Sequence, residues 1–178
     1  MNLPISIMYS PTTLKEFEVV ERKGIGHPDS LADAIAEEAS RRYSLYMKKH
    51  FGGYAHHWFD KVMLLGGESE IDYGKGEIVV PFVVIFAGKV VSHVGSSKIP
   101  LDQILFESAA HVLTSTLDNF FPAKHLKVEN RLWSARGPGQ GKSRYRPESS
   151  DCLVKEGSFG LSNDCNVCCG FAPMSSLE

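Results

Sequence analysis

The segment Gly24–Pro28, with the sequence GIGHP, most constrains the fold because the hydrophobic pattern changes across it. Before it, residues 13–22 partly alternate polar and apolar side chains, which predicts a strand. Gly24 and Gly26 permit a tight turn, and Pro28 fixes the backbone that follows. After it, apolar side chains recur at helical intervals up to about residue 50, which predicts a helix. These apolar residues are Leu31, Ile35, Ala39, Tyr43 and Tyr46.

Signals at both ends delimit this predicted helix. Asp29 and Ser30 are favourable N-cap residues, and Ser30 and Asp33 have the spacing of a capping box. Gly52 and Gly53 follow the last apolar position. Since glycine weakens a helix, we expect the helix to end there.

The rest of the first 134 residues alternates between strand-like and helix-like patterns. Two blocks rich in β-branched and aromatic residues, 61–66 and 77–94, predict strands, with Gly88-Lys89 as a hairpin turn inside the second. Residues 101–121 return to the helical period, and residues 125–133 predict another strand. This order predicts an α+β fold with mixed or antiparallel β-sheets and helices packed on one face.

Composition and charge exclude several classes of protein. Nineteen Lys and Arg oppose 21 Asp and Glu, without the basic excess that indicates a nucleic-acid or membrane-surface partner. The N-terminus has no signal-peptide pattern, and Pro81 and Gly88-Lys89 interrupt the apolar run from Ile78 to Val94, so we expect no membrane span. All four cysteines lie at or after Cys152, unlike a disulfide framework, which favours a cytoplasmic protein.

His27 and Asp29 lie just ahead of a predicted helix N-terminus, a suitable place for a phosphate chain and its metal. A histidine there can donate a hydrogen bond to a phosphate oxygen that gains charge. Asp29, with Asp33 one turn on, offers hard oxygen ligands for Mg²⁺. The alternative is that Asp29 only caps the helix and His27 is an ordinary loop residue.

The stretch Glu21–Asp33, ERKGIGHPDSLAD, resembles the signature of the archaeal-type S-adenosylmethionine synthetase family. Further blocks follow in the family's order and cover most of the chain. They are His56-His57, Asp60-Lys61, Leu65-Gly66-Gly67, Gly76-Glu77 before Pro81, Gly139-Gln140-Gly141 with Ser143, Asn163-Asp164, and Gly170-Phe171-Ala172-Pro173 with Ser175.

The resemblance implies a reaction and roles for the first motif. In that family, methionine sulfur attacks the 5′ carbon of ATP and releases triphosphate, which the same site hydrolyses with the help of two Mg²⁺ ions and a K⁺ ion. By resemblance, His27 would assist departure of the triphosphate and Asp29 would bind Mg²⁺. Asp33 would orient the loop or bind metal.

The resemblance also implies roles outside the first motif. Asp60 falls in a block near the methionine, and Gln140 falls in a Gly-rich loop that closes over the substrates. The family's essential Lys and Arg lie beyond the part that this chain covers, so the Lys and Arg of the 142–146 loop, Lys142 among them, would supply positive charge for the triphosphate in their place. Asp164 would face the nucleotide or methionine, although it can equally be a turn residue.

Family members are longer and consist of three similar α/β domains, so we predict an α/β domain over residues 1–134 carrying the HPD motif. Residues 135–178 would hold the Gly-rich loop and the start of a second, incomplete domain. The family's active site lies between two subunits, which implies a homodimer or a complementing subunit. The chain departs from the family pattern at Trp58 and at the cysteines of residues 165–169. An inactive paralogue that binds nucleotide or dimerises is therefore the alternative, as is a piece of a longer enzyme.

Readings from other classes are weaker. Residues 137–143, GPGQGKS, resemble a phosphate-binding loop, but the spacing is one residue short and no helix should follow. The four cysteines, Cys165 and Cys168 among them, could bind zinc, although we expect buried free thiols. His56-His57 and His93 are better explained as surface or satisfied core residues than as metal ligands or a base.

Overall fold

The computed structural model describes Phe17, residues 19–134 and residues 144–157. All of its helices and strands belong to one compact unit within residues 23–161. The helices are α1 (Pro28–Phe51), α2 (Leu101–Thr116), the one-turn α3 (Pro122–His125) and the 3₁₀ turn η1 (Ser150–Cys152). The strands are β1 (His57–Leu65), β2 (Glu68–Asp72), β3 (Lys75–Val80), β4 (Phe82–Val90), β5 (His93–Val94), β6 (Ser97–Lys98) and β7 (Leu126–Trp133).

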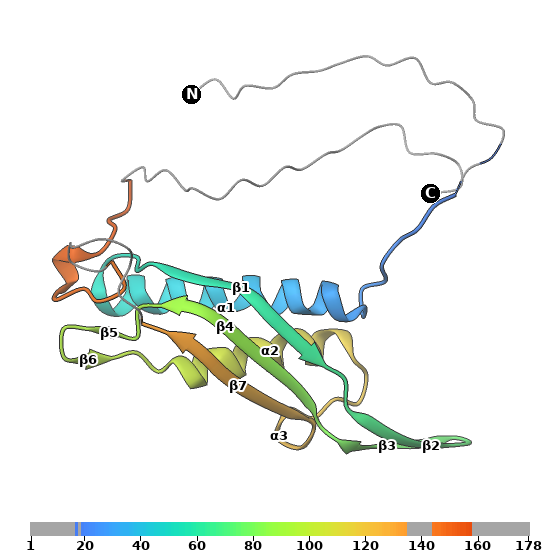
Figure 1. Ribbon diagram of the computed structural model, residues 1–178. Helices are drawn as coiled ribbons and strands as arrows, with labels where there is room; N and C mark the ends of the chain where they lie inside the picture. The colour runs from blue at the N-terminus through green and yellow to red at the C-terminus, as the bar shows by residue number, and fades with distance from the viewer. Residues whose placement is uncertain (1–16, 18, 135–143, 158–178) are drawn as a thin grey trace. The chain divides into compact units, whose positions relative to one another are not determined.

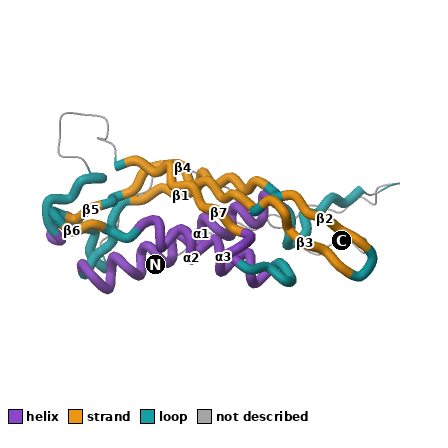
Figure 2. Tube along the Cα trace, turned by 90° about the horizontal axis from the view of Figure 1, so that it is seen from below, coloured by secondary structure: helices purple, strands orange, loops and turns teal. Residues whose placement is uncertain are grey.

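The main sheet has the order β1-β4-β7 and is mixed. β1 pairs antiparallel with β4, and β7 returns through α2 to pair parallel with β4. α1 packs on β1, α2 packs on β7, and the two helices contact each other. Figure 2 shows both helices on the same side of the sheet. The predicted α+β fold with helices on one face is confirmed.

The core lies between this sheet and the two helices. The buried positions of α1 are four residues apart, as an amphipathic helix requires: Leu31, Ile35, Ala39, Tyr43 and Met47. They meet Val84, Phe86 and Val90 of β4, and α2 adds Leu105, Ala109 and Leu113. The Tyr43 hydroxyl donates a 2.7 Å hydrogen bond to the carbonyl oxygen of Val91, so it ties α1 to the end of β4.

The other face of the sheet carries exposed apolar side chains. The register aligns Leu65 with Val83, and Met63 with Ile85, on neighbouring strands. Met63 is 58% exposed and Trp133, on β7, is 70% exposed. No helix in the described part of the chain covers this face (Figure 2). The sheet therefore presents an open apolar face, defined here by Trp58, Met63, Leu65, Val83, Ile85 and Trp133.

Two expectations about the strands are wrong. Phe17 and residues 19–22, the described part of the first predicted strand, lie in no strand. Gly88-Lys89 is not a hairpin turn, because β4 runs on to Val90. Gly88 has φ 143° and lies opposite an irregularity in β1, where a Cβ would overlap the carbonyl oxygen of Trp58. The glycine permits close strand contact, and the predicted 77–94 block breaks at Pro81 instead.

Two small hairpins extend the fold. β2 and β3 pair antiparallel around Gly74 and project beyond the main sheet (Figure 1), and β5 and β6 pair around Gly95. The described residues 144–157 return to the same unit, where Tyr54 and Val154 form a β-bridge. The boundary between residues 134 and 135 stays a prediction. Among the helices of the described ranges, none is both long and apolar enough to cross a membrane.

Candidate functional site

The predicted phosphate-and-metal motif forms a turn followed directly by α1. The backbone N–H of His27 donates to the carbonyl oxygen of Gly24 at 3.0 Å, which closes the turn. His27 itself, and not Asp29 or Ser30, is the N-cap residue of α1, with Pro28 in the first position. This corrects the predicted cap, because the imidazole performs the role that we assigned to the carboxylate or hydroxyl.

The cap defines which nitrogen of His27 can donate. Its Nδ1 accepts a hydrogen bond from the backbone N–H of Asp29 at 3.2 Å, so Nδ1 carries a lone pair and the neutral ring carries its proton on Nε2. The side chain is 42% exposed. The Nε2–H group is therefore available to an oxygen atom outside the protein, while the helix N-terminus adds backbone N–H groups and a favourable dipole for an anion.

Asp29 lies in the first turn of α1 with an exposed carboxylate. Its Oδ2 accepts a hydrogen bond from Lys23 Nζ, and His27 Nδ1 lies 3.9 Å from the same oxygen. The hydrogen bond and positive charge of Lys23 lower the pKa of Asp29 below its usual range. Asp29 is therefore an anion at neutral pH. Asp33, one turn further along the helix, is also exposed.

This donor set fits Mg²⁺ that arrives with a polyphosphate. Magnesium commonly binds one or two carboxylates and completes its shell with substrate phosphate oxygens and water. Asp29 supplies such a carboxylate. Within residues 19–134 and 144–157, no three His, Cys, Asp or Glu side chains gather to hold a metal by themselves.

The structure does not bring Asp60 to this motif. Asp60 lies in the irregular part of β1, is exposed, and accepts a 2.6 Å hydrogen bond from Lys61. His57, at the start of the same strand, is half-buried, and both of its ring nitrogens have hydrogen-bond partners. His57 Nδ1 lies 2.9 Å from the carbonyl oxygen of Ala55, and its Nε2 lies 2.7 Å from Ser40 Oγ. Burial lowers the pKa of His57, which keeps the ring neutral.

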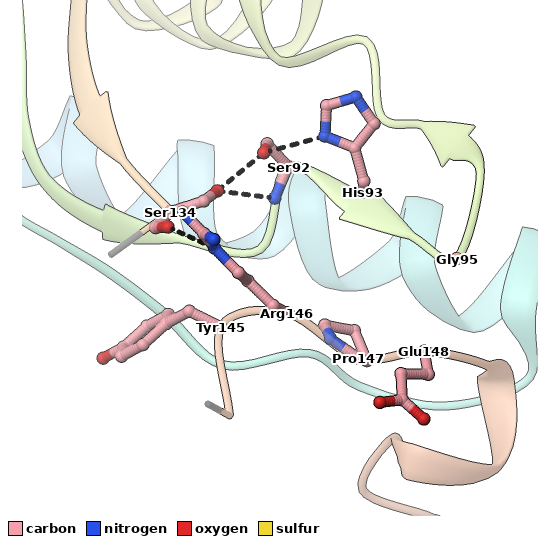
Figure 3. Close-up of a pocket in the computed structure, with 8 residues that line it drawn as sticks. All are labelled: Ser92, His93, Gly95, Ser134, Tyr145, Arg146, Pro147 and Glu148. Atoms are coloured by element: carbon pink, nitrogen blue, oxygen red, sulfur yellow. Dashed lines mark hydrogen bonds between the residues drawn. The ribbon is translucent and has the colours of Figure 1, made fainter. Parts of the chain in front are cut away.

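The structure also reveals a cavity of about 510 Å³ beside the end of β4 (Figure 3). The Ser134 hydroxyl donates to the carbonyl oxygen of Val90 at 2.7 Å, so Ser92 Oγ, 2.6 Å away, donates to Ser134. His93 Nδ1, 3.0 Å from Ser92 Oγ, is then a donor and cannot remove the Ser92 proton. The cavity therefore does not contain an activated serine nucleophile. Sequence reasoning missed it because its residues are distant in the chain.

The basic loop lies far from His27. Arg146 Nε donates to the carbonyl oxygen of Ser134 at 3.0 Å beside that cavity, and Tyr145 contacts the ring of His56. Tyr43 marks the position of this region along α1, because its hydroxyl donates to the carbonyl oxygen of Val91, and the next residue, Ser92, contacts Ser134. Tyr43 lies about 24 Å along the helix from His27 at ~1.5 Å per residue. Gln140 and Lys142 lie outside the described residues.

The remaining predicted residues are only partly described. Asp164, Cys165, Cys168 and Cys169 lie outside the described residues. Cys152 is a free thiol and is exposed, so our expectation that it is buried is wrong. Residues 144–151 contain turns and the start of η1 but no α-helix, as expected if no phosphate-binding loop precedes them.

Comparisons with known proteins agree with the resemblance. A model of the S-adenosylmethionine synthetase (AdoMet synthetase) family matches residues 4–178. The S-adenosylmethionine synthase of Caldivirga maquilingensis is 35% identical over 99% of this chain and 43% of its own length. Those of Thermoplasma acidophilum and Methanothermobacter marburgensis are 38% and 36% identical, over 94% and 95% of this chain and 39% and 40% of their own lengths. The chain spans about two fifths of these relatives. It belongs to the S-adenosylmethionine synthetase family.

Proposed function

We propose that the protein containing this chain is a methionine adenosyltransferase, which converts methionine and ATP to S-adenosylmethionine and cleaves the released triphosphate. The observation that carries the proposal is the N-terminus of α1. There the His27 cap leaves Nε2–H free to donate, directly beside an ionised Asp29. The relatives named S-adenosylmethionine synthase support the assignment of substrates.

His27 and Asp29 would act on the triphosphate end of ATP. As the bond to the 5′ carbon breaks, negative charge grows on the departing triphosphate, and the His27 Nε2–H can donate to an oxygen that gains it. Asp29 would hold Mg²⁺, which supplies further charge neutralisation on the phosphates when bound. The N-terminus of α1 contributes backbone N–H groups to the same anion. The K⁺ implied by the family has no ligand that we assign.

Two observations support a homodimer. The His27 end of α1 and the region that holds Ser134 and Arg146 are about 24 Å apart along α1. This distance is too long for one site within one unit. In a pair of copies, the His27 region of one copy can lie next to the Ser134 and Arg146 region of the other. The open apolar face, with Met63 and Leu65 exposed, is a surface that such a partner can bury. A separate complementing subunit would serve the same purpose.

The first experiment is isothermal titration of the full-length protein with AMP-PNP and Mg²⁺. We expect saturable binding that is lost or strongly weakened in His27→Ala and in Asp29→Ala. His50→Ala and Asp151→Ala are matched controls, since both change exposed residues of the same types, at the C-terminal end of α1 and in η1. Equal binding in all four variants would refute the assignment of the site.

A turnover assay then separates the enzyme from its alternative. Formation of S-adenosylmethionine from methionine and ATP, lost in His27→Ala, would support the synthetase. Binding of AMP-PNP without turnover, even at concentrations that favour assembly, would instead indicate an inactive paralogue that binds nucleotide as a subunit. Sedimentation of wild type beside Met63→Lys tests the dimer, because a charge on a buried apolar interface should favour the monomer.

A further inference from the structure

Lys23 lies across the turn from the carboxylate to which we assign Mg²⁺. Its ammonium group contacts Asp29 Oδ2, while the two side chains remain 57% and 63% exposed. An exposed ion pair of this kind contributes little to folding stability, because water screens it and two flexible side chains must be ordered. The pair can therefore open at small cost when another ligand competes for either partner.

The same carboxylate oxygen cannot serve Lys23 and Mg²⁺ equally well. A metal bound to Asp29 Oδ2 would lie within a few ångströms of the ammonium group, where two positive charges repel each other. Bare Mg²⁺ must therefore displace the Lys23 ammonium group from this oxygen and brings no anion in exchange. A metal that arrives with a polyphosphate brings anionic oxygens, and the lysine side chain is flexible enough to turn towards one of them.

We propose that Lys23 is a positioning residue that occupies Asp29 in the free protein and moves to a phosphate oxygen when metal and polyphosphate bind together. The exchange makes the site select metal–polyphosphate over metal alone. This inference rests on the proposed function, because it requires Asp29 to be the metal ligand. His27, 3.9 Å from the same oxygen, continues to accept the Asp29 N–H and retains its outward Nε2–H.

The test compares two ligands in the full-length protein: Mn²⁺ alone, followed by electron paramagnetic resonance, and inorganic tripolyphosphate with excess Mg²⁺, followed by calorimetry. Lys23→Gln removes the charge and retains much of the length. We expect it to bind Mn²⁺ about two- to fivefold more tightly, since the competing exposed ion pair is gone. It should bind Mg²⁺–tripolyphosphate about tenfold more weakly, since a charge-assisted hydrogen bond is lost. Lys23→Arg should retain most of the wild-type behaviour.

Lys75→Gln is the matched control, because Lys75 forms an exposed ion pair with Asp72 at 3.2 Å in the β2–β3 hairpin. It should change neither affinity. If Lys23→Gln weakens both ligands, Lys23 only maintains the turn, and the exchange is refuted while the proposed site stands. If it changes neither, Lys23 has no role towards the site. If wild type fails to bind Mg²⁺–tripolyphosphate at all, the proposed site is wrong, and the exchange is refuted with it.

Discussion

Replacement of Tyr43 by phenylalanine tests whether one hydrogen bond holds α1 to the sheet. Tyr43 and Val91 are both fully buried, and the phenol hydroxyl donates to the Val91 carbonyl oxygen at 2.7 Å. Burial raises the pKa of Tyr43, so the hydroxyl stays protonated and remains a donor at any moderate pH. Phenylalanine retains the packed ring but leaves a buried carbonyl oxygen without this partner.

The cost follows from that loss. A buried polar group left without its partner costs about 1–3 kcal/mol, and the void left by one oxygen atom adds little. We therefore expect Tyr43→Phe to lower the free energy of unfolding by about 2 kcal/mol. In a domain of this size, the melting temperature should then fall by about 4–8 °C.

Tyr46→Phe is the internal control for this measurement. Tyr46 is one turn further along α1, only half-buried, and stacks on His50 with ring centroids 4.2 Å apart. Its change should stay within about 0.5 kcal/mol, as for other substitutions near the surface. The assay is urea unfolding followed by circular dichroism, with equal slopes in wild type and both variants. Equal midpoints for Tyr43→Phe and Tyr46→Phe would refute the reasoning.

Three further predictions concern charge and backbone. Arg41 and Arg42 lower the pKa of Glu38 from 4.5 to about 2. Its contribution of about 2 kcal/mol to the free energy of unfolding should therefore be present above pH 4.5 and disappear as the pH falls towards 2. Glu38→Gln should show a flatter dependence of the free energy of unfolding on pH. Burial lowers the folded-state pKa of His57, so in NMR titration His57 should protonate below the ordinary histidine range, and the free energy of unfolding should fall as the pH drops below about 6.5. Gly88→Ala should destabilise the fold by about 2 kcal/mol or more through its positive φ and its overlap with Trp58, whereas Gly24→Ala, which meets no atom within 4 Å, should cost less in the same thermal melt.

The sequence predicted those parts of the fold that depend on local periodicity. The spacing of Leu31, Ile35, Ala39 and Tyr43 predicts an amphipathic helix with that face inside, and α1 buries all four residues. At the next turn the buried residue is Met47, whereas the predicted Tyr46 is only half-buried. Gly88 misled the strand prediction because a glycine signals either a turn or a close approach of two strands. Only the pairing of β4 with β1, distant in the chain, decides between them.

The candidate site was likewise only partly predictable from the sequence. The motif located His27 and Asp29, since their spacing to a helix start is a local property. The sequence could not show that the imidazole would be the cap, because Asp29 and Ser30 are the commoner cap residues. Nor could it show that Lys23 contacts Asp29, since that contact depends on how the turn between them folds.

Gly67 joins β1 to the β2–β3 hairpin and is exposed, yet a Cβ there would overlap the carbonyl oxygen of Val80. Surface positions ordinarily tolerate most substitutions. In a saturation mutagenesis library, Gly67 should nevertheless reject nearly every other amino acid as firmly as a core position does, while the adjacent Gly66, with no atom within 4 Å of its added Cβ, should accept many. Tolerance along this surface would then report how closely two backbone segments pass, and not how deeply a side chain is buried.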